Sequence, residues 1–108
     1  MTAWITLITA GLLEVGWAIG LKQSEGFSKL LPSMLTLIGA FSSFFLLSLA
    51  LKHLPVGTAY SVWTGIGAVG TAAVAMLFLG EDVSLPKLAG IGLIIAGITV
   101  LNLVGGHG

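Results

Sequence analysis

Four long apolar runs dominate this sequence and leave little of the chain for anything else. They cover residues 2–21, 30–51, 56–79 and 85–104. Each run is close to the roughly 20 residues that an α-helix needs to cross the hydrocarbon core of a bilayer. The composition, 56% hydrophobic and 7% charged, excludes a soluble globular domain. We therefore expect an all-α membrane protein, with a single domain of four transmembrane helices over residues 1–108.

The short segments between the runs carry most of the charge. Three of the four Lys and three of the four acidic residues lie in residues 22–29, 52–55 and 80–84. We therefore expect these connections to lie in the aqueous phase on either side of the bilayer. One side carries Lys22, Lys29 and Lys87, and the other carries Lys52 and the amino terminus, a weak bias that gives the chain little preference for one orientation. We expect insertion in both orientations and a head-to-tail pair of copies. Four helices enclose little more than their own packing seam, so a transport pathway also implies an oligomer.

Several function classes are excluded by what the sequence lacks. There is no Arg and no basic cluster, so nucleic acid is not an expected partner. There is no Cys, and the two His, His53 and His107, lie in a loop and at the C-terminus. No nucleotide-binding glycine motif or set of metal ligands is present. We expect no enzyme, no cofactor and no metal site.

Glu14 is the only charged side chain in the middle of a run. A charge at that depth costs about 2.5 to 3.5 kcal/mol on insertion scales, and such residues usually serve function. Desolvation disfavours the carboxylate form, so the group can hold a proton near neutral pH or release it and bind an organic cation. Competition between proton and cation for one site offers a route to exchange. The alternative is a protonated Glu14 that only hydrogen-bonds a neighbouring helix.

The helix face around Glu14 suits a ligand. Ala10, Gly11 and Ala18 lie three or four residues away and leave space beside the carboxylate. Trp17, also three residues away, offers a flat π face that attracts cations. We expect Trp17 to line the same site.

The third run carries a stripe of aromatic and hydroxyl side chains. Tyr60, Trp63, Thr64 and Gly67 share one helix face. If this face meets Glu14, it supplies cation–π contacts and a Tyr hydroxyl. Such stripes also occur where helices simply pack, and both interpretations remain open. The second run adds the hydroxyl of Ser43, which can bond a neighbouring helix, the carboxylate or the substrate.

Glycines in the last two runs suggest bending and assembly. Gly65, Gly67 and Gly70 interrupt the third run, where they predict either a hinge or close helix packing. Gly90 and Gly97 lie seven residues apart on one face of the fourth run. This spacing predicts a dimer interface.

Two longer segments carry a resemblance to a known family. They are residues 11–18, GLLEVGWA, and residues 55–67, PVGTAYSVWTGIG. With Gly26-Phe27 and Pro32-Ser33 between them in the right order, the chain resembles the small multidrug resistance family over essentially its whole length. The residues that follow Glu14, and the WTGIG segment, resemble the guanidinium exporter branch of that family.

The resemblance implies a fold and a mechanism. It implies an antiparallel, dual-topology homodimer in the bacterial inner membrane that exchanges protons for guanidinium-type cations by alternating access. Glu14 would be the carboxylate shared by proton and substrate, and Trp17, Tyr60 and Trp63 would line the site. Ser43 would hydrogen-bond Glu14. A planar guanidinium suits a carboxylate because two of its N–H groups can donate parallel charge-assisted hydrogen bonds.

Two departures from the branch bear on the substrate range. Asn102 stands where the guanidinium branch usually has Lys, and Gly16 replaces a branched apolar residue before Trp17. Both favour an alternative, a multidrug exporter of quaternary ammonium and lipophilic cations. A second alternative is a non-transporting membrane assembly subunit, with the face of Gly90 and Gly97 as its interface.

Overall fold

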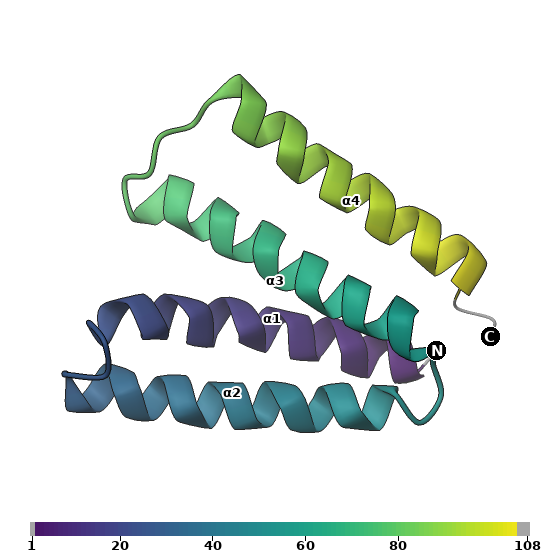
Figure 1. Cartoon of the computed structure of the whole chain (residues 1–108), viewed down its shortest axis with the longest axis horizontal. Helices are drawn as coiled ribbons and strands as arrows, with labels where there is room; N and C mark the ends of the chain where they lie inside the picture. Colours follow the sequence, from purple (N-terminus) through teal and green to yellow (C-terminus); the bar gives the residue numbers. More distant parts are fainter. Residues whose placement is uncertain (1, 106–108) are drawn as a thin grey trace.

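The computed structural model describes residues 2–105 as four helices that run alternately up and down (Figure 1). They are α1 (Thr2–Gln23), α2 (Leu30–Ala50), α3 (Val56–Phe78) and α4 (Leu85–Gly105). All four are long and apolar enough to cross a membrane, and no strand occurs within the described residues. The four expected membrane-spanning helices are therefore confirmed. The largest difference in bounds is at the end of α1, which continues two residues further than expected.

Proline and glycine set the ends of the last two helices. Pro55 directly precedes α3, and Pro86 lies in the first turn of α4, where its missing N–H costs no helical hydrogen bond. Gly80 follows α3 with a φ of 76°, a conformation that favours glycine. The turn brings the Glu81 N–H to the Ala75 carbonyl oxygen, 3.1 Å away. The connection thus folds back over the last turn of α3.

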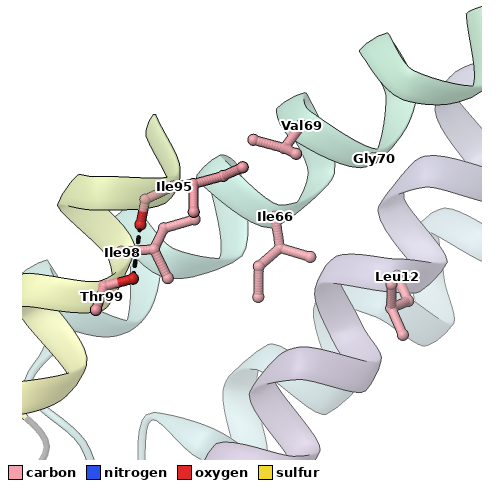
Figure 2. A pocket seen from close by; sticks show the side chains of 7 residues that line it. All are labelled: Leu12, Ile66, Val69, Gly70, Ile95, Ile98 and Thr99. Carbon is pink, nitrogen blue, oxygen red and sulfur yellow. Dashed lines mark hydrogen bonds between the residues drawn. The ribbon is translucent and has the colours of Figure 1, made fainter. Parts of the chain in front are cut away.

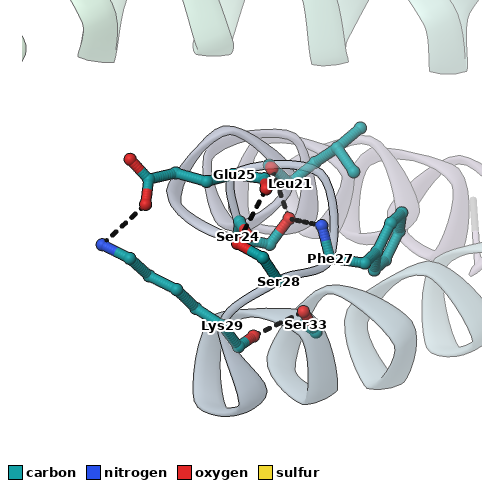
Figure 3. A network of polar contacts seen from close by, with 7 residues as sticks. All are labelled: Leu21, Ser24, Glu25, Phe27, Ser28, Lys29 and Ser33. Carbon is teal, nitrogen blue, oxygen red and sulfur yellow. Dashed lines mark hydrogen bonds and ion pairs between the residues drawn. The ribbon is translucent and has the colours of Figure 1, made fainter.

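A serine closes the tight connection between α1 and α2 (Figure 3). The buried Ser24 hydroxyl donates to the Leu21 carbonyl at 2.7 Å and accepts the Phe27 N–H at 3.1 Å. The chain can then turn through left-handed φ angles from Glu25 to Phe27. Glu25 and Lys29 pair at 3.0 Å, but both side chains are well exposed, so this pair adds little stability. Local hydrogen bonds, rather than charge, shape the α1–α2 hairpin.

Helix α1 is the centre of the bundle and packs against both α2 and α3. Small residues make these contacts close. A Cβ at Gly39 of α2 would lie 3.0 Å from the Trp17 Cβ, and one at Gly11 would lie 2.7 Å from an Ile66 methyl. Because lipid is as apolar as the helix surfaces, close van der Waals packing of this kind is what holds membrane helices together.

Helix α4 lies at the edge of the molecule (Figure 1) and contacts α3 alone. The contact is close at Gly65, where a Cβ would lie 2.7 Å from an Ile98 methyl. No residue of α4 is buried, and the chain is flat, with extents of 42 × 34 × 17 Å. One copy therefore presents most of its apolar side chains outward.

The contrast between two glycines of α1 gives a test of this packing. Gly11→Val should force Ile66 to move and lower the free energy of unfolding by about 1 to 3 kcal/mol, the usual cost of overpacking. Gly16→Val is the matched control, because among residues 2–105 no atom of a neighbouring helix lies within 4 Å of its added Cβ. Unfolding in detergent micelles measures both. Equal losses of unfolding free energy in the two variants would contradict the close contact between α1 and α3 at Gly11.

Candidate functional site

The Glu14 carboxyl group lies in the middle of α1 and faces the backbone of α3. A Cβ added at Gly67 would overlap the Glu14 carboxyl group. The carboxyl group can occupy this position only because Gly67 has no side chain. The Oε1 atom is buried and has no hydrogen-bond partner among residues 2–105. A buried acceptor left unpaired is costly, and a bound proton or a donor ligand would remove that cost.

A cavity of about 380 Å³ opens beside this carboxyl group. Most of its wall is α3, with α1 on one side and the α3–α4 connection at one end. Its side chains are small, hydroxyl-bearing or acidic, and none of them is cationic. The lining residues are Glu14, Ala18, Thr64, Gly67, Ala68, Thr71, Ala72, Ala75 and Glu81. Such a lining suits a small cation with hydrogen-bond donors.

Next to the cavity, four aromatic rings link the first three helices. Trp17 and Phe44 have ring centroids 6.1 Å apart, Phe44 and Trp63 5.5 Å, and Trp63 and Tyr60 5.7 Å. All three pairs are tilted, a favourable arrangement for aromatic rings. The row begins three residues along α1 from Glu14. On α3 it reaches Trp63, one turn before Gly67, and ends at Tyr60, about two turns before Gly67, so it borders the carboxylate site.

A hydrogen bond to Ser43 holds one ring of this row, that of Trp63, in place. Ser43 is fully buried, and its hydroxyl donates to the Ala10 carbonyl at 2.7 Å and accepts the Trp63 indole N–H at 2.9 Å. The hydrogen bond from Ser43 to Glu14 that the family resemblance implies is therefore absent here. The reason is the pairing of α1 with α2, which sets Ser43 opposite Ala10, one turn before the carboxylate.

The residues expected at the site thus divide into two groups. Glu14 lines the cavity. Trp17, Tyr60 and Trp63 belong to the aromatic row, Ser43 is hydrogen-bonded to it, and none of these four lines the cavity. Trp63 is only 5% exposed, but Tyr60 is 57% exposed. Tyr60 lines a neighbouring shallow pocket that shares two residues, Thr64 and Ala68, with the cavity.

Trp17 carries the second unpaired polar atom of this region. Its indole N–H is buried and has no acceptor within the described part of the chain. A cation brings donors rather than acceptors, so it would pair with Glu14 and leave this N–H unchanged. What Trp17 can offer a cation is the face of its ring.

The three glycines of α3 all lie at close helix contacts. Gly65 faces Ile98, Gly67 faces Glu14, and Gly70 faces Val15. These contacts support packing as a role for the glycines, and α3 is one continuous helix. A hinge at Gly65 and Gly67 stays a prediction.

Gly90 and Gly97 of α4 lie in a different environment. Both are exposed, and no atom of the described chain lies within 4 Å of a Cβ added at either. Gly90 also lines a pocket with Ala72 and Met76 of α3. A dimer interface there also stays a prediction.

Three residues at the site were not anticipated from the sequence. Thr71 lies seven residues after Thr64, a spacing that could have indicated their common face. Phe44 has no distinguishing signal among the neighbouring phenylalanines. Glu81 reaches the cavity only because the chain turns back after α3, which the sequence pattern does not reveal.

A second cavity, of about 270 Å³, lies between α1, α3 and α4 (Figure 2). Its lining is aliphatic except for Thr99, whose hydroxyl donates to the Ile95 carbonyl at 2.9 Å. Leu12 and Ile66 face it from α1 and α3. With no free polar group it suits apolar chains or helix packing, and it is a poor site for a cation.

Comparison with known proteins agrees with this geometry. The sequence profile described as Small Multidrug Resistance protein matches residues 2–94. The chain belongs to this family. It is 60% identical over 101 residues to the guanidinium exporter of Yersinia pseudotuberculosis serotype I, covering 94% of this chain and 97% of the relative. The guanidinium exporters of Salmonella typhimurium and Citrobacter freundii are 56% and 55% identical over 101 residues, covering 94% of this chain and 96% of each relative.

These findings confirm the predicted family resemblance and its guanidinium exporter branch. Relatives with this name are transporters rather than enzymes. Together with the four apolar helices, they identify the chain as a multi-pass membrane protein.

The role of Ser43 can be tested against its neighbour in the chain. Ser43→Ala leaves the Trp63 N–H buried without its acceptor, so we expect a loss of about 1 to 3 kcal/mol in unfolding free energy and a shift in tryptophan fluorescence. Ser42→Ala should change stability by less than about 0.5 kcal/mol, because Ser42 is exposed. Detergent unfolding followed by fluorescence compares the two. Indistinguishable variants would argue against the Ser43–Trp63 bond.

Proposed function

We propose that this protein is a proton-coupled antiporter that exports guanidinium and small guanidinyl cations across the bacterial inner membrane. The observation that carries the proposal is the unpaired, buried Oε1 of Glu14 beside a cavity with no cationic side chain. Its guanidinium exporter relatives, at 55 to 60% identity, support the choice of cation. Glu14 alternately binds a proton or the cation.

Coupling follows from having one carboxylate for two ligands. Protonated Glu14 is neutral and tolerates its position in the membrane, whereas ionised Glu14 needs a counterion. A guanidinium supplies the charge and two parallel N–H donors. The hydroxyls of Thr64 and Thr71 can accept further N–H groups and so replace part of the water lost by the cation. Since the proton and the cation cannot occupy Glu14 at the same time, the protein carries them in opposite directions across the membrane.

The working unit in this proposal is an antiparallel homodimer of dual topology. Within one copy α4 contacts only α3, and among the described residues there is space for a side chain at Gly90 and Gly97. Tyr60, at the edge of the aromatic row, is also exposed. A second copy would cover these surfaces, and alternating access would arise from relative movement of the two.

The two departures from the guanidinium branch lie away from the cavity. Asn102 lines a different pocket, with Trp4, Ile8 and Val62 among its neighbours. Gly16 has no atom within 4 Å of an added Cβ. Neither position shapes the wall around Glu14. A quaternary ammonium also lacks N–H donors for the unpaired oxygen, so guanidinium fits the site better.

Proton release on cation binding tests the proposal directly. Guanidinium added to purified protein in weakly buffered detergent should release protons as it displaces them from Glu14, and Glu14→Gln should abolish the release. Tetramethylammonium is the comparison cation and should release fewer protons. Release mainly by tetramethylammonium would indicate the multidrug alternative, and no release by either would favour the assembly subunit.

The dimer interface can be tested on one helix. Gly90→Leu and Gly97→Leu should each shift the protein from dimer to monomer, because a bulky side chain prevents close approach. Gly92→Leu is the control, being equally open but on another face of α4. Light scattering after size exclusion gives the mass of the protein in each micelle. A monomeric Gly92→Leu, or dimers throughout, would place the interface elsewhere.

A further inference from the structure

A second carboxylate, Glu81, lines the same cavity as Glu14. It belongs to the α3–α4 connection, where the charged groups of the chain meet water. Its N–H donates to the carbonyl of Ala75, which also lines the cavity, so the backbone is tied to this end. The Glu81 side chain is 52% exposed. It is therefore open to the aqueous phase and to the cavity at once.

The wall between the two carboxylates is formed by small residues of α3. Gly67 touches Glu14, and Ala75 lies eight residues further along the helix, which is about 12 Å at a rise of about 1.5 Å per residue. The cavity-lining positions between them are Ala68, Thr71 and Ala72. No bulky or cationic side chain of the lining stands between the two acidic groups.

A side-chain cation already lies beside Glu81. The Lys87 ammonium is 3.9 Å from Glu81 Oε1 and donates to the Asp82 carbonyl at 2.9 Å. Lys87 is 46% exposed. Ion pairs this long and this exposed contribute little, so another cation can displace the ammonium from the carboxylate. The lysine shows that a cation fits at this position.

We propose that Glu81 is a substrate-recruiting residue, which binds the incoming cation at the end of the cavity before it moves to Glu14. Lys87 competes with the substrate for this carboxylate and so weakens the recruiting site. The inference rests on the proposed function, because it assigns the cation a first contact on the way to Glu14.

The distance between the carboxylates decides how Glu81 acts. Ala75, which holds the Glu81 N–H, lies about 12 Å along α3 from Gly67, which adjoins Glu14. This rise exceeds the Debye length of about 8 Å at physiological ionic strength, so the exposed Glu81 charge acts only weakly on Glu14. Glu81 acts instead by direct contact with the cation. Its effect should therefore fall on the substrate concentration needed for half-maximal transport, with little effect on the maximal rate, and should weaken in salt.

Guanidinium transport by protein in liposomes tests this at low and high salt. Glu81→Gln should raise KM about twofold to fivefold at low ionic strength, the range of an exposed charge pair, with an unchanged maximal rate. The difference should shrink at 1 M salt, where the Debye length is about 3 Å. Glu81→Asp keeps the charge and should retain a KM near that of the unmodified protein. Asp82→Asn is the matched control, because Asp82 does not line the cavity.

Lys87 provides a change in the opposite direction. Lys87→Gln should lower KM, and the Glu81→Gln, Lys87→Gln double variant should match Glu81→Gln alone, since the lysine acts only through that carboxylate. An equal KM in Glu81→Gln and Asp82→Asn overturns the inference, as does a fall in maximal rate with KM unchanged. These results leave the proposed function intact. Failure of the unmodified protein to transport guanidinium would overturn both.

Discussion

The close approach of α1 to α3 at Gly67 is the contact on which the site depends. Apolar attraction between helices is weak inside a bilayer, so the helices are held by surface fit and by the few polar groups between them. Gly11, Gly67 and Gly70 remove side chains where α1 comes nearest. The same absence of a side chain that allows packing at Gly67 gives the Glu14 carboxyl group its place. Gly67 therefore serves both the packing of α1 on α3 and the location of the Glu14 carboxyl group.

Helix α1 has two different sides. Toward α2 it is held by Ser43, whose hydroxyl joins the Ala10 carbonyl to the Trp63 indole. Toward α3 and the following connection it borders the cavity that contains Glu14. A satisfied hydrogen-bond network is rigid, and an open cavity with an unpaired oxygen is ready for a ligand. In the proposed mechanism, the fixed side would hold the carboxylate still while the other side exchanges its ligand.

Much of this arrangement was predictable because the bilayer imposes simple rules. Helix length follows from membrane thickness, and a lone carboxylate in a span marks a functional group. Thus the four helices and the importance of Glu14 can be inferred from the sequence, although the structure does not test its role. The bond between Ser43 and Glu14 that the resemblance implied is not present within residues 2–105, because it depends on the pairing of α1 with α2 to within one turn. Glu81 was missed because a turn of the chain, rather than helical spacing, brings it to the cavity.

Helix α4 differs from the other three in having no buried residue and a single neighbour. None of its residues lines the cavity beside Glu14, although Lys87 in its first turn lies near Glu81. Within one copy, substitutions along α4 beyond this first turn therefore replace no side chain that lines the cavity. Natural variation in this helix should therefore follow the surface that covers it, whether lipid or protein, more than the chemistry of the cavity.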